Sequence, residues 1–222
     1  MQTQGLIAKG QRPETFCERR IGILGGTFNP PHLGHLQIAE QVYLEFGMEK
    51  VLILPVGIPP HKSGEDVLVR MLREQMCRLF CAERDFLELC TMEMDRQGYT
   101  YTIDTLRALN RALKPGERIY YIIGTDTLFQ LETWKEHETV LRGDFCTFVC
   151  VPRPGDHPGR VREKIAELKE KYGVRILLSS GAGPDISSTK VREAFRAGED
   201  IGAWVPRSVR QFMEENHVFQ GA

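Results

Sequence analysis

Short apolar runs alternate with longer amphipathic stretches along this chain, and the alternation limits the folds that are open to it. It is typical of an open parallel sheet whose crossover helices cover both faces. The run 119–123 (Ile-Tyr-Tyr-Ile-Ile) has no charged residue and is rich in β-branched and aromatic side chains, as expected of a strand buried on both faces. We therefore predict a doubly wound α/β fold with a mostly parallel sheet and helices on both faces.

The same pattern predicts where the elements lie. We expect strands at 20–25, 50–55, 86–90, 118–123, 145–151 and 175–179, and helices at 33–46, 66–83, 102–113, 125–131, 134–141, 158–171, 188–197 and 206–216. The loop 55–65 follows the second strand and is rich in proline and glycine, and open α/β sheets place ligand loops at such positions. At 222 residues, we expect one domain over 19–222, after a polar and disordered tail at 1–18 that lacks the apolar core of a signal peptide.

The overall charge is close to neutral. The chain has 29 basic and 30 acidic residues, so its formal net charge is −1 and no global field attracts DNA, RNA or an anionic membrane. No apolar run approaches the roughly 20 residues that span a bilayer. We expect a cytoplasmic protein without nucleic-acid or membrane partners, in which any anion site is local.

Six cysteines are spread along the chain: Cys17, Cys77, Cys81, Cys90, Cys146 and Cys150. Two pairs are four residues apart, but neither has the Cys-x-x-Cys spacing or the nearby histidine of a zinc site. We expect buried, reduced thiols with a structural role.

The segment 25–35 (Gly-Gly-Thr-Phe-Asn-Pro-Pro-His-Leu-Gly-His) joins the first expected strand to the first expected helix. Its leading glycines allow a sharp turn and let a ligand approach the backbone closely. His32 and His35 are three residues apart, so their side chains lie on the same side of a helix. A helix N-terminus with paired imidazoles favours a phosphate site. The alternative is a tight turn with two surface histidines.

A second candidate anion site lies at 186–192 (Ile-Ser-Ser-Thr-Lys-Val-Arg), where another amphipathic helix begins. Ser187 or Ser188 can cap this helix, and the N–H groups of its first turn lie at the positive end of the helix dipole. Lys190 and Arg192 place positive charge at this end, where it is unfavourable because it opposes the helix dipole. A bound polyphosphate would offset this unfavourable interaction. The alternative is an ordinary capped surface helix.

Together these two segments resemble the nucleotidyltransferases of the His-x-Gly-His class, and more closely the bacterial nicotinate-nucleotide adenylyltransferase family. Shorter matches follow in the family's order: Pro59-Pro60-His61-Lys62, Tyr99-Thr100-Tyr101-Thr102-Ile103-Asp104-Thr105-Leu106, Ile123-Gly124-Thr125-Asp126, Thr133-Trp134-Lys135, Val151-Pro152-Arg153-Pro154-Gly155 and Val205-Pro206-Arg207-Ser208-Val209. The resemblance covers 21–219 and implies a Rossmann-like nucleotidyltransferase fold. One departure is Thr100, where the family more often has serine.

The resemblance implies that ATP and nicotinate mononucleotide react to give deamido-NAD and pyrophosphate, a step of NAD biosynthesis. The nucleophile is a phosphate oxygen of the mononucleotide that is already ionised at neutral pH, so neither a protein nucleophile nor a general base is required. Catalysis then depends on in-line positioning and on stabilising charge at the α-phosphate. Mg²⁺ is expected to bind mainly through the ATP phosphates, with no protein metal cage.

Residue roles also follow from the resemblance. His35 is expected to donate to an α-phosphate oxygen, and His32 to contact the phosphate chain beside it. The remaining phosphate and ATP contacts are assigned to Gly25, Gly26, Thr27, Ser187, Ser188, Thr189, Arg192 and Lys62. Lys62 could instead be a solvated loop lysine.

The acceptor side is assigned in the same way. Gly124 and Asp126 are expected to line the dinucleotide site, with Asp126 accepting from a ribose hydroxyl. Thr102, Trp134 and Lys135 are expected to form the nicotinate pocket, with Trp134 covering the pyridine ring and with local N–H groups and a helix N-terminus favouring its carboxylate. The alternatives are that Asp126 caps a helix and Trp134 only packs. Arg153 fits either a phosphate contact or an ion pair.

Several other functions compete with this one. A pantetheine-phosphate adenylyltransferase or a cytidylyltransferase of the same class is the nearest, and nicotinamide mononucleotide is an alternative acceptor. A dinucleotide-binding dehydrogenase or regulatory module would need Gly-x-Gly-x-x-Gly, which is absent here. A class I aminoacyl-tRNA synthetase would need more chain for binding tRNA. A nucleotide-binding protein without turnover and a homo-oligomeric assembly both stay open.

Overall fold

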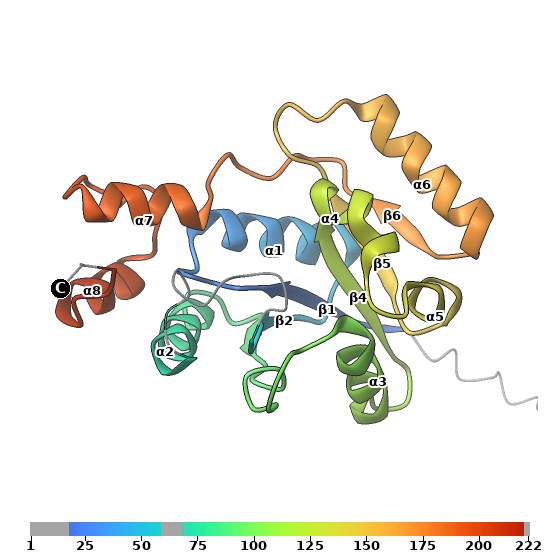
Figure 1. The fold of residues 1–222 in the computed structure, drawn as a ribbon, viewed down its shortest axis with the longest axis horizontal. Helices are drawn as coiled ribbons and strands as arrows, with labels where there is room; N and C mark the ends of the chain where they lie inside the picture. Colours follow the sequence, from blue (N-terminus) through green and yellow to red (C-terminus); the bar gives the residue numbers. More distant parts are fainter. Residues whose placement is uncertain (1–17, 59–67, 69, 220–222) are drawn as a thin grey trace, which may run out of the picture.

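A six-stranded sheet forms the centre of the computed structural model, which describes residues 18–58, 68 and 70–219 (Figure 1). The strands are β1 (Arg19–Gly26), β2 (Lys50–Pro55), β3 (Leu87–Leu89), β4 (Glu117–Gly124), β5 (Thr147–Val151) and β6 (Ile176–Leu178). They follow the order β3-β2-β1-β4-β5-β6, and every neighbouring pair is parallel. This confirms the doubly wound parallel sheet. The strand order reverses between β1 and β4, so their carboxyl ends form the switch point at which such sheets bind ligands.

Helices pack against both faces of this sheet. They are α1 (Leu33–Phe46), α2 (Arg70–Cys81), α3 (Thr102–Ala112), α4 (Thr125–Gln130), α5 (His137–Arg142), α6 (Pro158–Tyr172), α7 (Ser188–Arg196) and α8 (Arg207–Glu215), with a short 3₁₀ turn η2 (Leu131–Thr133). One apolar core joins the sheet to α1, α2, α7 and α8, and a second core joins it to α3, α5 and α6. Each central strand contributes alternate residues to the two cores, which explains its continuous apolar run.

Two expected helices differ from the prediction in their bounds. The helix expected at 66–83 is described from Arg70 and ends at Cys81, where the N–H of Glu83 donates to the Phe80 carbonyl at 3.2 Å in a tightened final turn. The helix expected at 134–141 begins only at His137, because Trp134 is extended and Glu136 has a φ of 53°. Residues 1–17, and with them Cys17 and nearly all of the expected tail, lie outside the described part of the chain.

The described cysteines agree with the sequence interpretation. Cys77, Cys81, Cys90, Cys146 and Cys150 are all free, and every one except the half-buried Cys90 is buried in the apolar cores. Within residues 18–58, 68 and 70–219, no helix is long and apolar enough to cross a membrane.

Arg73 of α2 connects the loops that follow β1 and β2. Its guanidinium group is buried, with 2% of the residue exposed, and donates to the carbonyl oxygens of Thr27 at 3.0 Å, Val56 at 2.7 Å, Gly57 at 2.9 Å and Leu68 at 3.2 Å. Buried carbonyl groups need such donors, because leaving one unpaired is unfavourable. The side chain therefore fixes two loops at the carboxyl end of the sheet.

This arrangement predicts that Arg73→Met destabilises the fold. The substitution removes a donor from one buried and three part-buried carbonyl groups, and an orphaned buried group costs about 1–3 kcal/mol. We expect the free energy of unfolding, measured with urea, to fall by at least about 3 kcal/mol. Arg78→Met is the matched control, because Arg78 lies on the same helix in an exposed ion pair with Glu74 at 3.0 Å, a kind of pair worth about 0–1 kcal/mol. Equal losses in the two variants would contradict the role of Arg73.

Candidate functional site

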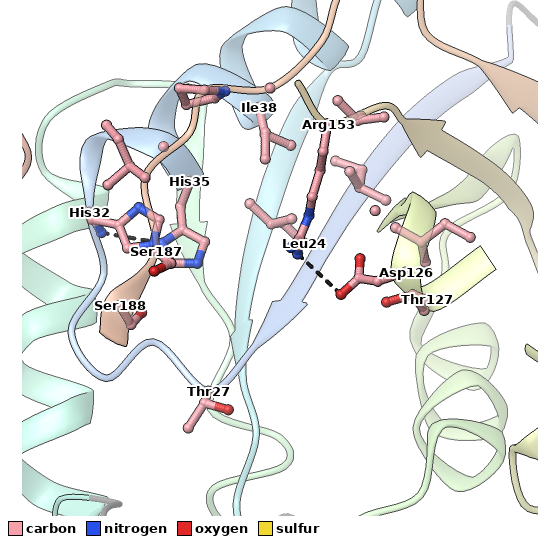
Figure 2. A pocket seen from close by; sticks show the side chains of 18 of the residues that line it. Leu24, Thr27, His32, His35, Ile38, Asp126, Thr127, Arg153, Ser187 and Ser188 are labelled. Carbon is pink, nitrogen blue, oxygen red and sulfur yellow. Dashed lines mark hydrogen bonds and ion pairs between the residues drawn. The ribbon is translucent and has the colours of Figure 1, made fainter. Parts of the chain in front are cut away.

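A cavity of about 790 Å³ opens at the carboxyl ends of β1 and β4 (Figure 2). Its walls come from the end of β1, the start of α1, the segments after β4 and β5, and the chain leading into α7. The predicted site residues that line it are Gly25, Thr27, His32, His35, Gly124, Asp126, Trp134, Ser187, Ser188, Thr189 and Arg192. Segments far apart in the sequence therefore meet around one space, at the position that the strand order favours.

Four predicted site residues are not among the lining residues. Lys62 lies outside the described residues, together with the rest of its Pro-Pro-His-Lys match. Gly26 ends β1, and Thr102 begins α3. The ammonium group of Lys135 lies 4.1 Å from the centre of the Tyr101 ring, a cation–π contact.

The two histidines form a stacked pair at the start of α1. Their ring centres are 3.7 Å apart with an interplanar angle of 28°. The backbone N–H of His32 donates to Nδ1 of His35 at 3.2 Å, so Nδ1 of His35 carries no proton. In a neutral ring the proton then lies on Nε2. His35 thus offers one N–H donor from a side chain that is partly exposed to the cavity.

Burial keeps both rings neutral. It lowers the pKa of His32 from 6.5 to about 4. The pKa of His35 is lowered well below 6.5, first by burial and then by the repulsion that a protonated His32 and Arg153 would exert. Neutral imidazoles at pH 7 act as hydrogen-bond donors and not as cations.

Gly34 permits the close placement of these rings. A Cβ at Gly34 would lie 2.8 Å from Nδ1 of His32 and 3.3 Å from Cβ of Ile186. Any larger residue would therefore push the His32 ring or the chain leading into α7 out of place. The glycine between the two histidines is a packing requirement of the site.

The start of α7 is tied to the loop that follows β1. Ser188 Oγ donates to the carbonyl oxygen of Pro30 at 2.9 Å, and Arg192 Nη1 donates to that of Asn29 at 2.9 Å. Ser187 is the N-cap, and its side chain accepts from the N–H of Lys190 at 3.2 Å. The two segments that the sequence singled out are thus in direct contact, and Ser187 is the capping serine.

The N-terminus of α1 is less available to an anion than the sequence suggested. The N–H of Leu33 donates to the carbonyl oxygen of Trp204 at 2.7 Å, and the N–H groups of His35 and Leu36 both donate to the carbonyl oxygen of His32. These three N–H groups are therefore already engaged, and the histidine rings add donors at this end of α1. The hydrogen bond between Leu33 and Trp204 joins residues that are far apart in the sequence, so the pattern at 25–35 could not predict it.

Asp126 and Arg153 form an ion pair at 3.1 Å within the cavity (Figure 2). Asp126 lies in the first turn of α4, whose N-cap is Gly124, and both charged side chains are more than half exposed. A Cβ at Gly124 would lie 2.7 Å from Oδ1 of Asp126, so the glycine makes room for this carboxylate. Arg153 was expected to make either a phosphate contact or an ion pair, and this structure contains the ion pair.

Aromatic side chains from β4, β5 and the end of η2 pack together at one wall of the cavity. Trp134 makes edge-on contacts with Tyr121 and Phe148, with ring centres 6.3 Å apart in each case. Trp134 and Tyr121 also line the cavity, so Trp134 both packs and offers a surface to a ligand.

The sequence prediction missed part of the lining. Tyr121, Ile38 and the segment 183–186 all face the cavity. The N–H of Gly183 donates to the carbonyl oxygen of Pro152 at 2.8 Å, and a Cβ at Gly183 would lie 3.1 Å from the Ile38 side chain. The Gly-Ala-Gly-Pro run at 181–184 was the available signal, since it directly precedes the predicted serine segment.

The carboxylates of the cavity already have cationic partners. Asp126 pairs with Arg153, and Asp185 pairs with Lys190 at 2.8 Å. Over the described ranges, no group of three His, Cys, Asp or Glu side chains could hold a metal ion. The paired carboxylates fit a cation that is coordinated mainly by the phosphate groups of a bound nucleotide.

The histidine pair predicts an acid-sensitive stability. Both pKa values are lower in the folded protein than the ordinary 6.5, so below pH 6.5 the unfolded chain binds more protons. The free energy of unfolding should fall as the pH falls from 6.5 toward 4, and it should fall less in His32→Gln. Urea unfolding at a series of pH values measures this. The exposed His157 supplies the control His157→Gln, and superimposable pH profiles for His32→Gln and the native chain would contradict the prediction.

Sequence comparison places this architecture in a family. A family model described as cytidylyltransferase-like matches residues 23–194. A relative from Thermoanaerobacter sp., named probable nicotinate-nucleotide adenylyltransferase, is 36% identical over 91% of this chain and 95% of its own length. A relative of the same name from Desulfitobacterium hafniense is also 36% identical, over 91% of this chain and 96% of its own length.

Solved structures agree with the fold. The nicotinic acid mononucleotide adenylyltransferase of Plasmodium falciparum, complexed with APC, superposes with a TM-score of 0.71 at 14% identity, covering 90% of this chain and 97% of that one. Its complex with NaAD gives the same TM-score at 15% identity. At these identities the likeness concerns the fold alone. The sequence matches span nearly the whole chain, and the chain therefore belongs to the cytidylyltransferase-like family and, within it, to the nicotinate-nucleotide adenylyltransferases.

Proposed function

We propose that the chain transfers the adenylyl group of ATP to nicotinate mononucleotide, forming nicotinate adenine dinucleotide and pyrophosphate. The observation that carries the proposal is the meeting of the His32–His35 pair with the N-terminus of α7 at one cavity. A triphosphate bound there would have its α-phosphate at the histidines and its β- and γ-phosphates at α7.

Positioning supplies most of the catalysis in this scheme. A phosphate oxygen of the mononucleotide attacks the α-phosphorus of ATP in line, the new P–O bond forms, and the bond to the departing pyrophosphate breaks. Holding two reactants in this geometry corresponds to roughly 7–11 kcal/mol of barrier. No covalent bond to the protein is formed.

His35 stabilises the charge that develops on the α-phosphate. Its Nδ1 accepts from the backbone of His32, so Nε2–H is directed away from that bond and serves as the donor. His32 contacts the neighbouring part of the phosphate chain. Because both rings are neutral, they donate without losing a proton to the phosphates.

Arg192 and the hydroxyl groups of α7 hold the leaving pyrophosphate. Nε of Arg192 is buried and has no hydrogen-bond partner among the described residues, so it remains as a donor for a phosphate oxygen. Ser187, Ser188 and Thr189 line the same part of the cavity. The reacting phosphates are bordered at the end of β1 by Gly25, Gly26 and Thr27. Lys62 supplies a further phosphate contact.

Mg²⁺ accompanies the nucleotide. It supplies charge neutralisation of the triphosphate and is held mainly by phosphate oxygens and water. The pairing of Asp126 with Arg153 and of Asp185 with Lys190 supports this arrangement, because neither carboxylate is left without a counter-charge.

The acceptor lies on the opposite side of the end of β1. Trp134 covers the pyridine ring, Thr102 and Lys135 border the nicotinate pocket, and Asp126 accepts from a ribose hydroxyl. Gly124 gives the ribose close access to the backbone at the end of β4. We also propose a cytoplasmic location, which the free cysteines among the described residues support. We further propose a homo-oligomeric assembly.

The substrate assignment predicts a pattern of turnover. Pyrophosphate release from ATP and Mg²⁺ should be fastest with nicotinate mononucleotide, slower with nicotinamide mononucleotide and undetectable with phosphopantetheine. A coupled assay for pyrophosphate measures all three acceptors on the full chain. A faster rate with the nicotinamide compound or with phosphopantetheine would refute the assignment.

The role of His35 predicts a loss of rate without loss of fold. His35→Ala removes the Nε2–H donor and should lower kcat for adenylyl transfer at least about tenfold, which corresponds to about 1.4 kcal/mol of barrier. Exposed His157→Ala is the control and should keep the native rate. Unchanged turnover in a folded His35→Ala protein would remove His35 from the mechanism.

A further inference from the structure

Tyr121 of β4 is a cavity-lining side chain with no role in the reaction proposed above. Only 7% of the residue is exposed, and its ring contacts Trp134 and Phe148 edge-on, with ring centres 6.3 and 6.1 Å away. The neighbouring Tyr120 points to the opposite core, as the alternation of a strand requires. Tyr121 therefore places a hydroxyl group on the face of the sheet that carries Trp134.

Gly25 gives this hydroxyl its place at the cavity. A Cβ at Gly25 would lie 2.8 Å from the Tyr121 oxygen, closer than side-chain atoms tolerate. Both residues line the cavity. The missing side chain at the end of β1 thus lets the tyrosine oxygen reach the junction between the phosphate region and the aromatic wall.

The hydroxyl is a proton donor at neutral pH. Burial, followed by the charge of Glu93, raises the pKa of Tyr121 far above neutrality. The side chain of Thr102 acts in the opposite direction and lowers that pKa. At neutral pH the phenol therefore keeps its proton and can donate it to a group in the cavity.

We propose that Tyr121 is a specificity-determining residue of the acceptor pocket, donating a hydrogen bond to the carboxylate on the pyridine ring. The inference rests on the proposed function, which places that ring on Trp134, beside Tyr121. A carboxylate accepts a charge-assisted hydrogen bond that is roughly twice as strong as a neutral one. An amide offers only a neutral carbonyl oxygen and adds two N–H donors that need partners, so the phenol favours the acid over the amide.

Tyr121→Phe tests this assignment, because it removes the hydroxyl and keeps the ring. With the full chain, ATP and Mg²⁺, we expect kcat/KM for nicotinate mononucleotide to fall at least about tenfold. The value for nicotinamide mononucleotide should change less than about threefold, and KM for ATP should stay unchanged. Tyr120→Phe is the matched control, since it removes a hydroxyl that donates to the exposed Glu18 at 2.6 Å, away from the cavity, and it should leave the acceptor ratio unchanged.

Two further measurements separate selectivity from stability. Calorimetric titration of each mononucleotide alone should give the same shift in relative affinity without turnover. Gly25→Ala, which introduces a methyl group against the tyrosine oxygen, should lower the same acceptor ratio if Tyr121→Phe does not fold. Thermal unfolding of every variant reports any structural effect.

The outcomes distinguish the two proposals. A native chain that does not use nicotinate mononucleotide refutes the proposed function. A native chain that uses it, together with an unchanged acceptor ratio in folded Tyr121→Phe, refutes only the assignment of Tyr121. Equal losses with both acceptors also refute it, because a merely structural hydroxyl would affect both substrates alike.

Discussion

The site depends on side chains that bind the backbone carbonyl groups of the loop after β1. Arg73 donates to Thr27, Arg192 donates to Asn29 and Ser188 donates to Pro30. These donors come from α2 and α7, which follow the loop by tens and by more than a hundred residues. Because the loop has no strand partner of its own, its conformation is stabilised by these long-range hydrogen bonds, and the histidine pair begins directly after it.

The electrostatics of the cavity combine neutral donors with cations whose charge is already partly balanced. The His32 and His35 rings are kept neutral by burial, Arg153 is paired with Asp126, and Lys190, just outside the lining, is paired with Asp185. A polyphosphate can therefore compete for the cations without displacing protons from the histidines. This division suits a reaction that stabilises negative charge and needs no general base.

Most of the fold and many of the residues that line the cavity could be predicted from the sequence, but the contacts between those residues could not. The strand at 118–123 and the helix at 33–46 were predicted almost to the residue, because both carry a strong periodic signal. The helix expected at 134–141 was misplaced at its start, because Glu136 adopts a left-handed conformation that propensity does not indicate. Tyr121 was assigned only to a buried strand, since its distance to Gly25 depends on the pairing of β4 with β1.

The sequence by itself determined the alternation that builds a parallel sheet, the glycine turn after the first strand and a serine cap at 187 or 188. Each of these is a local signal, written within about fifteen residues. Only the tertiary structure decided that His35 is neutral with its proton on Nε2 and that the N–H of Leu33 donates to the carbonyl oxygen of Trp204. It also decided that the Tyr121 oxygen fills the space beside Gly25. Burial and contacts across the sheet exist only once the strands have taken their order, and both protonation and donor directions depend on them.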